Sequence, residues 1–132
     1  MAGDLERFVR EEFKEHALGK TFSRRFEPEE FDGDILIQTD VPETVHAELG
    51  NTRAYGFDLR NTKGKTAFAK QKEYLLSEMR TVFSAMTGEI MFGYSIQDMR
   101  GNVRRGGAED LPVLTASQAD KYVVLVSNVP GP

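Results

Sequence analysis

The chain lacks cysteine and tryptophan altogether, and it has only two histidines among its 132 residues. Without cysteine there is no disulfide, thiolate zinc site, iron–sulfur cluster or cysteine nucleophile. Long apolar runs are also missing, since the longest, 123–126, is far too short to span a membrane. The N-terminus is charged from its fourth residue and lacks the pattern of a signal peptide. These absences predict a protein of the cytoplasmic compartment with no membrane partner.

The composition is that of one ordinary globular domain spanning 1–132. Hydrophobic residues make up 39% of the chain, nine of them phenylalanine, and we find no repeat or low-complexity linker. A chain of this length buries about two-thirds of its surface, enough for one core. The net charge of −4 argues against a general nucleic-acid binder.

The charge is unevenly distributed along the chain. Residues 1–50 carry 6 basic and 13 acidic side chains, whereas residues 51–132 carry 11 and 8. Halves of opposite charge suit head-to-tail association, in which an acidic face of one subunit meets a basic face of the next. An equally simple interpretation is a chance asymmetry on a solvated surface.

Apolar periodicity predicts two helices. The first runs from 5 to about 18, with Asp4 as N-cap and Gly19 after its end. Its predicted core face consists of Leu5, Phe8, Val9, Phe13 and Ala17. The second helix covers 66–86 and ends before Gly88. Its predicted core face consists of Phe68, Leu75, Leu76, Met79, Val82, Phe83 and Met86.

Strand signals occupy the rest of the chain. Strands are expected at 34–39, 45–49, 54–60, 90–97 and 122–129, the second and third forming a hairpin around Gly50-Asn51. The predicted order is α-β-β-β-α-β-β. We therefore expect an α+β fold, a mainly antiparallel sheet with two helices packed on one face. The segment 100–120 is predicted to be a long loop.

Two motifs suggest chemistry, but their residues do not support it. Gly64-Lys65-Thr66 matches the tail of a P-loop, but Leu59 stands where that motif needs glycine, so a turn and helix cap are favoured. The acidic stretch 27–34 cannot form an EF-hand loop, because Pro28 and Thr39 would occupy ligand positions. That stretch is interpreted as a solvated acidic surface.

The histidines and serines also lack catalytic partners in the sequence. His16 is expected near the end of the first helix, where a cation favours the helix dipole, and His46 is expected to point outward from its strand. Neither has the companion residues of a zinc site, and no serine lies in a Gly-x-Ser-x-Gly context. The sequence thus predicts no catalytic residue, no metal and no cofactor, and a protein that is not an enzyme.

The segment 100–120 holds the remaining candidate residues. Arg100, Arg104 and Arg105 stand among glycines, where they could contact phosphates or an acidic neighbouring subunit. No aromatic residue is interleaved to stack bases, which argues against a nucleic-acid partner. Leu111, Val113 and Leu114 are apolar enough to pack on something, either this domain or a partner.

Taken in order, these segments resemble a known family. The order is a first helix, Val41-Pro42-Glu43, a strand to Gly50-Asn51, an alternating strand ending in Arg60, a long helix ending in Met86-Thr87-Gly88, a strand, a loop with Gly101-Asn102 and Arg104, and a last strand. This succession is similar to the small tail-terminator and minor-capsid (tail-completion) proteins of long-tailed bacteriophages. The likeness runs from about Leu5 to Val129.

The resemblance implies a structural virion protein of the tail and neck, made in the host cytoplasm. Such proteins form a ring, usually hexameric, that caps the tail tube and joins it to the head–neck connector. Its partners would then be copies of itself, the tail tube protein and the connector proteins. The contact residues expected on this basis are Arg100, Arg104, Arg105, Leu111 and Val113, with Glu27, Glu29 and Glu30 on the opposite face. The alternatives are another head–tail joining component, or a small-molecule-binding α+β regulatory domain.

Overall fold

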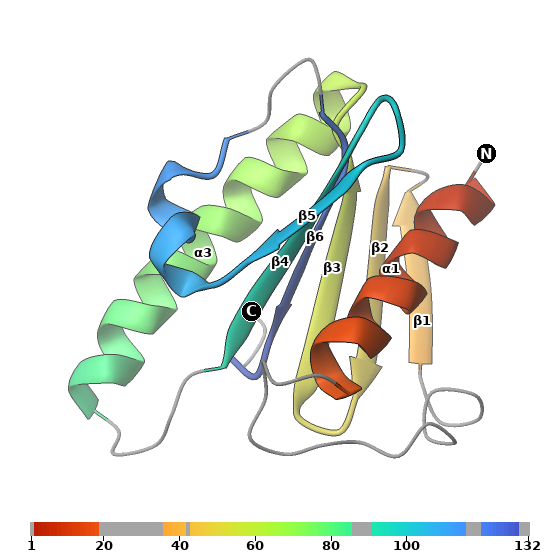
Figure 1. Ribbon diagram of the computed structural model, residues 1–132. Coiled ribbons are helices and arrows are strands. Elements are labelled where there is room, and N and C mark those ends of the chain that lie inside the picture. Colours follow the sequence, from red (N-terminus) through yellow and green to blue (C-terminus); the bar gives the residue numbers. More distant parts are fainter. Residues whose placement is uncertain (1, 19–35, 42, 86–90, 116–119, 130–132) are drawn as a thin grey trace.

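The computed structural model describes residues 2–18, 36–41, 43–85, 91–115 and 120–129 (Figure 1). Its elements in chain order are α1 (Ala2–Leu18), β1 (Leu36–Val41), β2 (Thr44–Leu49), β3 (Thr52–Asp58), α3 (Thr62–Ala85), β4 (Phe92–Asp98), β5 (Val103–Gly106), the 3₁₀ helix η1 (Ala108–Val113) and β6 (Asp120–Ser127). The acidic stretch 27–34, with Glu27, Glu29 and Glu30, lies outside these residues.

The strands form one six-stranded sheet in the order β1-β2-β3-β6-β4-β5. Every neighbouring pair is antiparallel. The last strand, β6, lies between β3 and β4, so the end of the chain holds the two halves of the sheet together (Figure 1). The predicted α+β class and antiparallel sheet are confirmed.

The two helices lie on opposite faces of the sheet, so the prediction that both pack on one face is wrong. On β6, Tyr122, Val124 and Val126 belong to the apolar cluster under α1. The alternate residues Val123 and Leu125 belong to the cluster that contains α3 and η1. A continuous run of buried apolar residues is typical of a strand covered on both sides. That run was the sequence signal for a two-faced sheet.

The core face predicted for the first helix is confirmed, because all five of its residues are at most 5% exposed. On the opposite face, Phe68 and Leu75 of α3 are buried, while Leu76 and Met79 are half-buried against the same cluster. The side chains of the other three residues predicted there, Val82, Phe83 and Met86, lie outside the described part of the chain. In the described residues, no helix is both long enough and apolar enough to cross a membrane.

The start of α3 explains the Gly64-Lys65-Thr66 stretch. The helix begins four residues before the predicted position, because Asn61 acts as its N-cap: the Gly64 N–H donates to the Asn61 side-chain oxygen at 2.8 Å. A Cβ built on Gly64 would overlap the Asp58 carbonyl oxygen, so only glycine fits this close approach. The prediction of a turn and cap in place of a P-loop is confirmed.

The segment predicted as a loop, 100–120, contains β5 and η1. β5 is only four residues long, and its burial shows no alternation, because it is an edge strand that pairs with β4 alone. Such a strand carries no period-2 apolar signal in the sequence. η1 packs Leu111 into the α3-side core, where Leu114 joins it, whereas Val113 is 76% exposed. Leu111 therefore packs on its own domain.

Candidate functional site

The three arginines of the candidate contact surface have different surroundings. Arg100 is exposed at the turn of the β4–β5 hairpin, where its backbone N–H donates to Asp98 Oδ1 at 2.9 Å. Arg104 is exposed and pairs across the strands with Ile96, whose side chain faces the α3 side of the sheet. Arg105 is the next residue, so its side chain points to the α1 side of the sheet.

On the α1 side, Arg105 forms a bidentate ion pair with a buried carboxylate. Its Nε donates to Glu12 Oε1 at 2.7 Å and its terminal nitrogen donates to Glu12 Oε2 at 3.0 Å. Glu12 is 4% exposed, on the inner face of α1. Because its guanidinium is engaged within the chain, Arg105 is a poorer candidate for a subunit contact than Arg100 or Arg104.

The same carboxylate connects to a buried serine and histidine. Ser95 Oγ donates to Glu12 Oε1 at 2.6 Å, and His16 Nε2 lies 2.9 Å from Ser95 Oγ. His16 lies in the last turn of α1, as predicted, but its side chain is 4% exposed between α1 and β4 and is bonded to Ser95.

Burial and charge shift the pKa values of this cluster. Burial alone raises the pKa of Glu12, but hydrogen bonds from Arg105 and Ser95 outweigh it, so the pKa lies below its ordinary value of 4.5. Burial lowers the pKa of His16 below 6.5, against the attraction of Glu12. At neutral pH the cluster therefore holds a carboxylate, a guanidinium and a neutral imidazole.

A Ser–His–Glu set suggests nucleophilic catalysis, but this geometry does not support it. Ser95 is 0% exposed, so no substrate reaches its hydroxyl, and its proton points to the carboxylate instead of a base. The cluster fastens α1 to β4 and β5. Within the described residues, no three histidine, aspartate or glutamate side chains are grouped to hold a metal ion.

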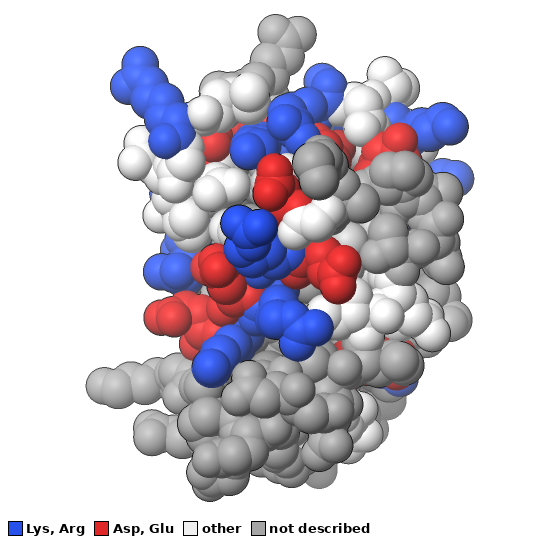
Figure 2. Space-filling view, turned by 90° about the vertical axis from the view of Figure 1, so that its right-hand side faces the viewer, with Lys and Arg blue, Asp and Glu red and all other residues white. Residues whose placement is uncertain are grey.

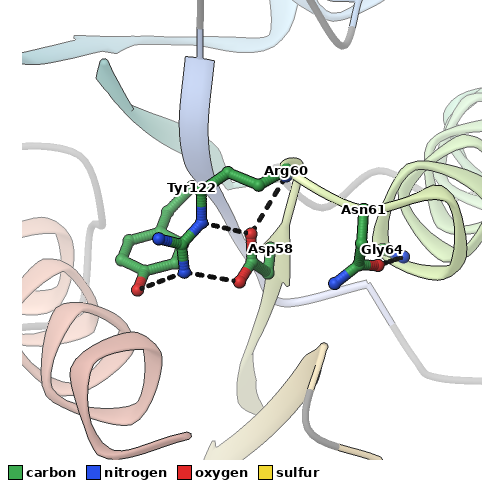
Figure 3. A network of polar contacts seen from close by, with 5 residues as sticks. All are labelled: Asp58, Arg60, Asn61, Gly64 and Tyr122. Carbon is green, nitrogen blue, oxygen red and sulfur yellow. Dashed lines mark hydrogen bonds and ion pairs between the residues drawn. The ribbon is translucent and has the colours of Figure 1, made fainter. Parts of the chain in front are cut away.

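A second polar network closes the end of β3 (Figure 3). Arg60 donates from Nε and a terminal nitrogen to the two Asp58 oxygens at 3.0 and 2.8 Å, and it donates to the Tyr122 hydroxyl at 3.3 Å. Hydrogen bonds from Arg60 are the main reason why the pKa of Asp58 falls below its ordinary value. The Arg60 guanidinium and the Lys121 ammonium also lie 5.3 and 4.9 Å from the centre of the Tyr122 ring.

The other histidine, His46, also contacts neighbouring side chains. His46 stacks on Tyr55 with ring centres 4.6 Å apart, and its Nε2 lies 3.3 Å from Glu48 Oε1. Glu48 also accepts a hydrogen bond from Arg53 at 3.2 Å. His46 lies on the face opposite Val45 and Leu49, as predicted, and is half-buried there against Tyr55. It links β2 to β3 across the sheet.

A hollow with polar walls lies on the α3 side, between η1, the β4–β5 hairpin and the start of β6. Its volume is about 460 Å³. Its walls are formed by Tyr94, Ile96, Arg104, Asp110, Val113, Leu114, Thr115 and Asp120. The Tyr94 hydroxyl donates to Asp110 Oδ2 at 3.0 Å, and burial with this bond raises the pKa of Tyr94. Sequence reasoning missed this cavity, because its walls come from four separate elements.

Figure 2 shows the side of the molecule that lies to the right in Figure 1, next to α1 and β1. Basic and acidic side chains are interspersed over the described part of this side. The uneven charge of the two halves of the sequence therefore does not become a field of one sign here. Phosphate binding over a broad surface, which needs such a field, finds no support on this side.

Comparisons of the chain with protein-family models, with curated proteins and with solved structures found no match. The function must therefore be inferred from the residues and their arrangement.

Proposed function

We propose that the protein is a structural subunit that assembles head to tail with copies of itself into a ring. In this proposal it serves as a tail-terminator protein of a long-tailed bacteriophage, as the resemblance of its sequence implies. The ring would cap the tail tube and join it to the head–neck connector in the virion. Another head–tail joining component would use the same mode of assembly.

The observation that carries the proposal is the polarity of the two edge strands. Among the described strands, β1 and β5 each pair on one side only. The sheet has six strands with every pair antiparallel, so β1 and β5 run in opposite directions. When a second copy continues the sheet, its β5 therefore meets β1 of the first copy in antiparallel orientation. Head-to-tail contacts of this kind form a ring when the rotation between successive copies closes, and an open filament when it does not.

The hydrogen-bonding pattern of β5 leaves groups free for such pairing. At the hairpin end, the Asp98 N–H donates to the Asn102 carbonyl at 3.0 Å. Bonded and non-bonded pairs alternate along an antiparallel ladder, so Arg104 is bonded to β4. The backbone N–H and C=O groups of Val103 and Arg105 then point to the open edge. Unpaired edge groups are a template for another strand.

Charge supports the same pairing. β5 carries Arg104, which is exposed. A two-fold contact between two β5 edges would bring these like charges together, which disfavours it against a contact between β5 and a different edge. Val103 at 37% exposed and Met99 at 56% exposed add apolar surface at the same edge.

The test is the mass of the purified protein by light scattering, with negative-stain images of the same peak. Val103→Pro removes an outward N–H without removing a bond to β4 and is expected to abolish rings. Val103→Thr keeps that N–H and is the matched control. Reversing Arg100 and Arg104 to Glu is expected to weaken assembly; Arg105 is left unchanged because it holds Glu12. A stable dimer, a monomer at every concentration, or rings that survive Val103→Pro would contradict the edge-to-edge ring.

A further inference from the structure

One carboxylate in the cavity beside η1 has no partner in the protein. Asp120 is 9% exposed and lines this cavity. Of the residues that the structure describes, none forms a hydrogen bond or ion pair with its carboxylate. Removing a carboxylate from water without a compensating partner is costly, so buried carboxylates are normally paired. A positive group from outside the chain would satisfy it.

A β-bulge points this carboxylate into the cavity. Along β6, Tyr122 and Val124 face α1 while Val123 faces α3. Strict alternation would place residue 120 on the α1 side. However, Gln97 pairs with Tyr122 and Asp98 pairs with Asp120, which leaves Lys121 as an extra residue without a partner on β4. The extra residue turns Asp120 to the α3 side, and bulges that redirect a side chain in this way are common beside binding sites.

The other walls define what kind of molecule fits. Asp110 adds a second negative charge, although it already accepts the Tyr94 hydroxyl. Arg104 is the cross-strand neighbour of Ile96 on the same face, with no ion pair to a described residue, so its guanidinium is available to an anion. Ile96 and Leu114 supply apolar wall between the charges. The cavity therefore offers a negative end, an apolar middle and a positive group.

We propose that this cavity binds a small organic zwitterion. Its ammonium group pairs with Asp120, its acidic group pairs with Arg104, and its carbon chain contacts Ile96 and Leu114. A volume of about 460 Å³ lies within the range of small-molecule sites, roughly 300–1,000 Å³. A bare divalent ion is a poorer fit, because the described residues contain no group of three carboxylates or histidines and the walls are partly apolar. The proposal does not depend on ring formation.

The experiment uses 5-aminopentanoate as the probe, with pentylamine and pentanoate as single-charge comparisons. Binding is followed by NMR titration and by the melting temperature, which rises when a ligand binds the folded state alone. Wild type is expected to bind aminopentanoate best, pentylamine more weakly and pentanoate not at all. Asp120→Asn should weaken aminopentanoate about tenfold or more. Arg104→Gln should remove the preference for aminopentanoate over pentylamine.

Glu109→Gln is the matched control. Glu109 is a carboxylate on η1, next to the cavity, but it does not line the cavity. Without ligand, Asp120→Asn is expected to melt no lower than wild type, because it removes an unpaired buried charge. Should that variant fail to fold, the exposed Arg104→Gln change decides the result alone. No response of wild type to the probes up to about 10 mM, or equal binding by the Arg104 and Asp120 variants and wild type, would overturn the proposal. So would a response to Mg²⁺ but not to aminopentanoate.

Discussion

At the residue scale, the most consequential feature is the cluster formed by the buried residues Glu12, His16 and Ser95 with the exposed Arg105. The bonds that join its α1 members to its strand members connect residues 79 to 93 positions apart along the chain. The buried polar groups of the cluster are hydrogen-bonded to one another, and buried polar groups need such partners to avoid a loss of stability. The cluster therefore specifies how α1 sits on the sheet.

This cluster should make the protein sensitive to acid. Because the pKa of folded His16 lies below 6.5, the unfolded chain binds a proton first as the pH falls, and stability drops below about pH 6.5. Because the pKa of folded Glu12 lies below 4.5, its contribution is present above that pH and is lost at lower pH. Urea unfolding between pH 8 and pH 3 measures both phases.

His16→Gln separates the two phases. This variant should lose the decline between about pH 7 and pH 5 while keeping the one at lower pH, because glutamine can still donate to Ser95 but does not titrate. Glu12→Gln should show the reverse. An unchanged slope between pH 7 and pH 5 in His16→Gln would contradict the assignment of the upper phase to this imidazole.

At the element scale, α3 depends on its first turn. No acidic residue stands in that turn, so the Asn61 side chain is the polar group that satisfies its backbone donors in the described contacts. Asn61→Ala should lower the free energy of unfolding by about 1 kcal/mol. Chemical denaturation measures the loss, and Asn61→Asp, an equally good cap, should restore most of it. A loss in Asn61→Asp as large as that in Asn61→Ala would show that the cap is not the cause.

The edge strand β5 depends on neighbouring elements for its conformation. Its four residues, Val-Arg-Arg-Gly, have little strand character by themselves. They become a strand because β4 offers a ladder and because Arg105 is fastened to Glu12. The same dependence makes this edge the place where a second chain can add, which is the basis of the ring proposal.

At the scale of the whole molecule, the sheet carries two separate apolar cores that share β6. Phe13 is 0% exposed under α1, and Phe68 is 3% exposed under α3. Phe13→Ala and Phe68→Ala should each lower the free energy of unfolding by about 3–5 kcal/mol. Because the central strand belongs to both cores, we expect one cooperative transition, with the two losses additive.

Denaturation followed by far-ultraviolet circular dichroism and by tyrosine fluorescence tests this expectation. Coincident curves in wild type and in both variants are predicted. Two separated transitions in either variant would mean that each face unfolds alone and that β6 does not couple them. The surface variant Glu109→Gln serves as a control for the measurement, because this side chain is exposed.

The sequence by itself determined the elements with strong periodicity. The core face of α1, the β2–β3 hairpin at Gly50-Asn51 and the long helix were predictable because apolar spacing is a local property. The helix cap was also visible, since Asn61 acts on a residue three positions away. In each case the side chains that decide the structure lie within one or two turns of one another.

Only the tertiary structure decided the rest. The placement of the helices on opposite faces follows from both sides of β6 being buried at the centre of the sheet. The partners of Glu12 and His16 come from strands about 80 or more residues away. The direction of Asp120 depends on one extra residue in the register of β6 against β4. These features rest on contacts between distant segments, which local spacing does not encode, because pairing and register are selected by the packing of the whole chain.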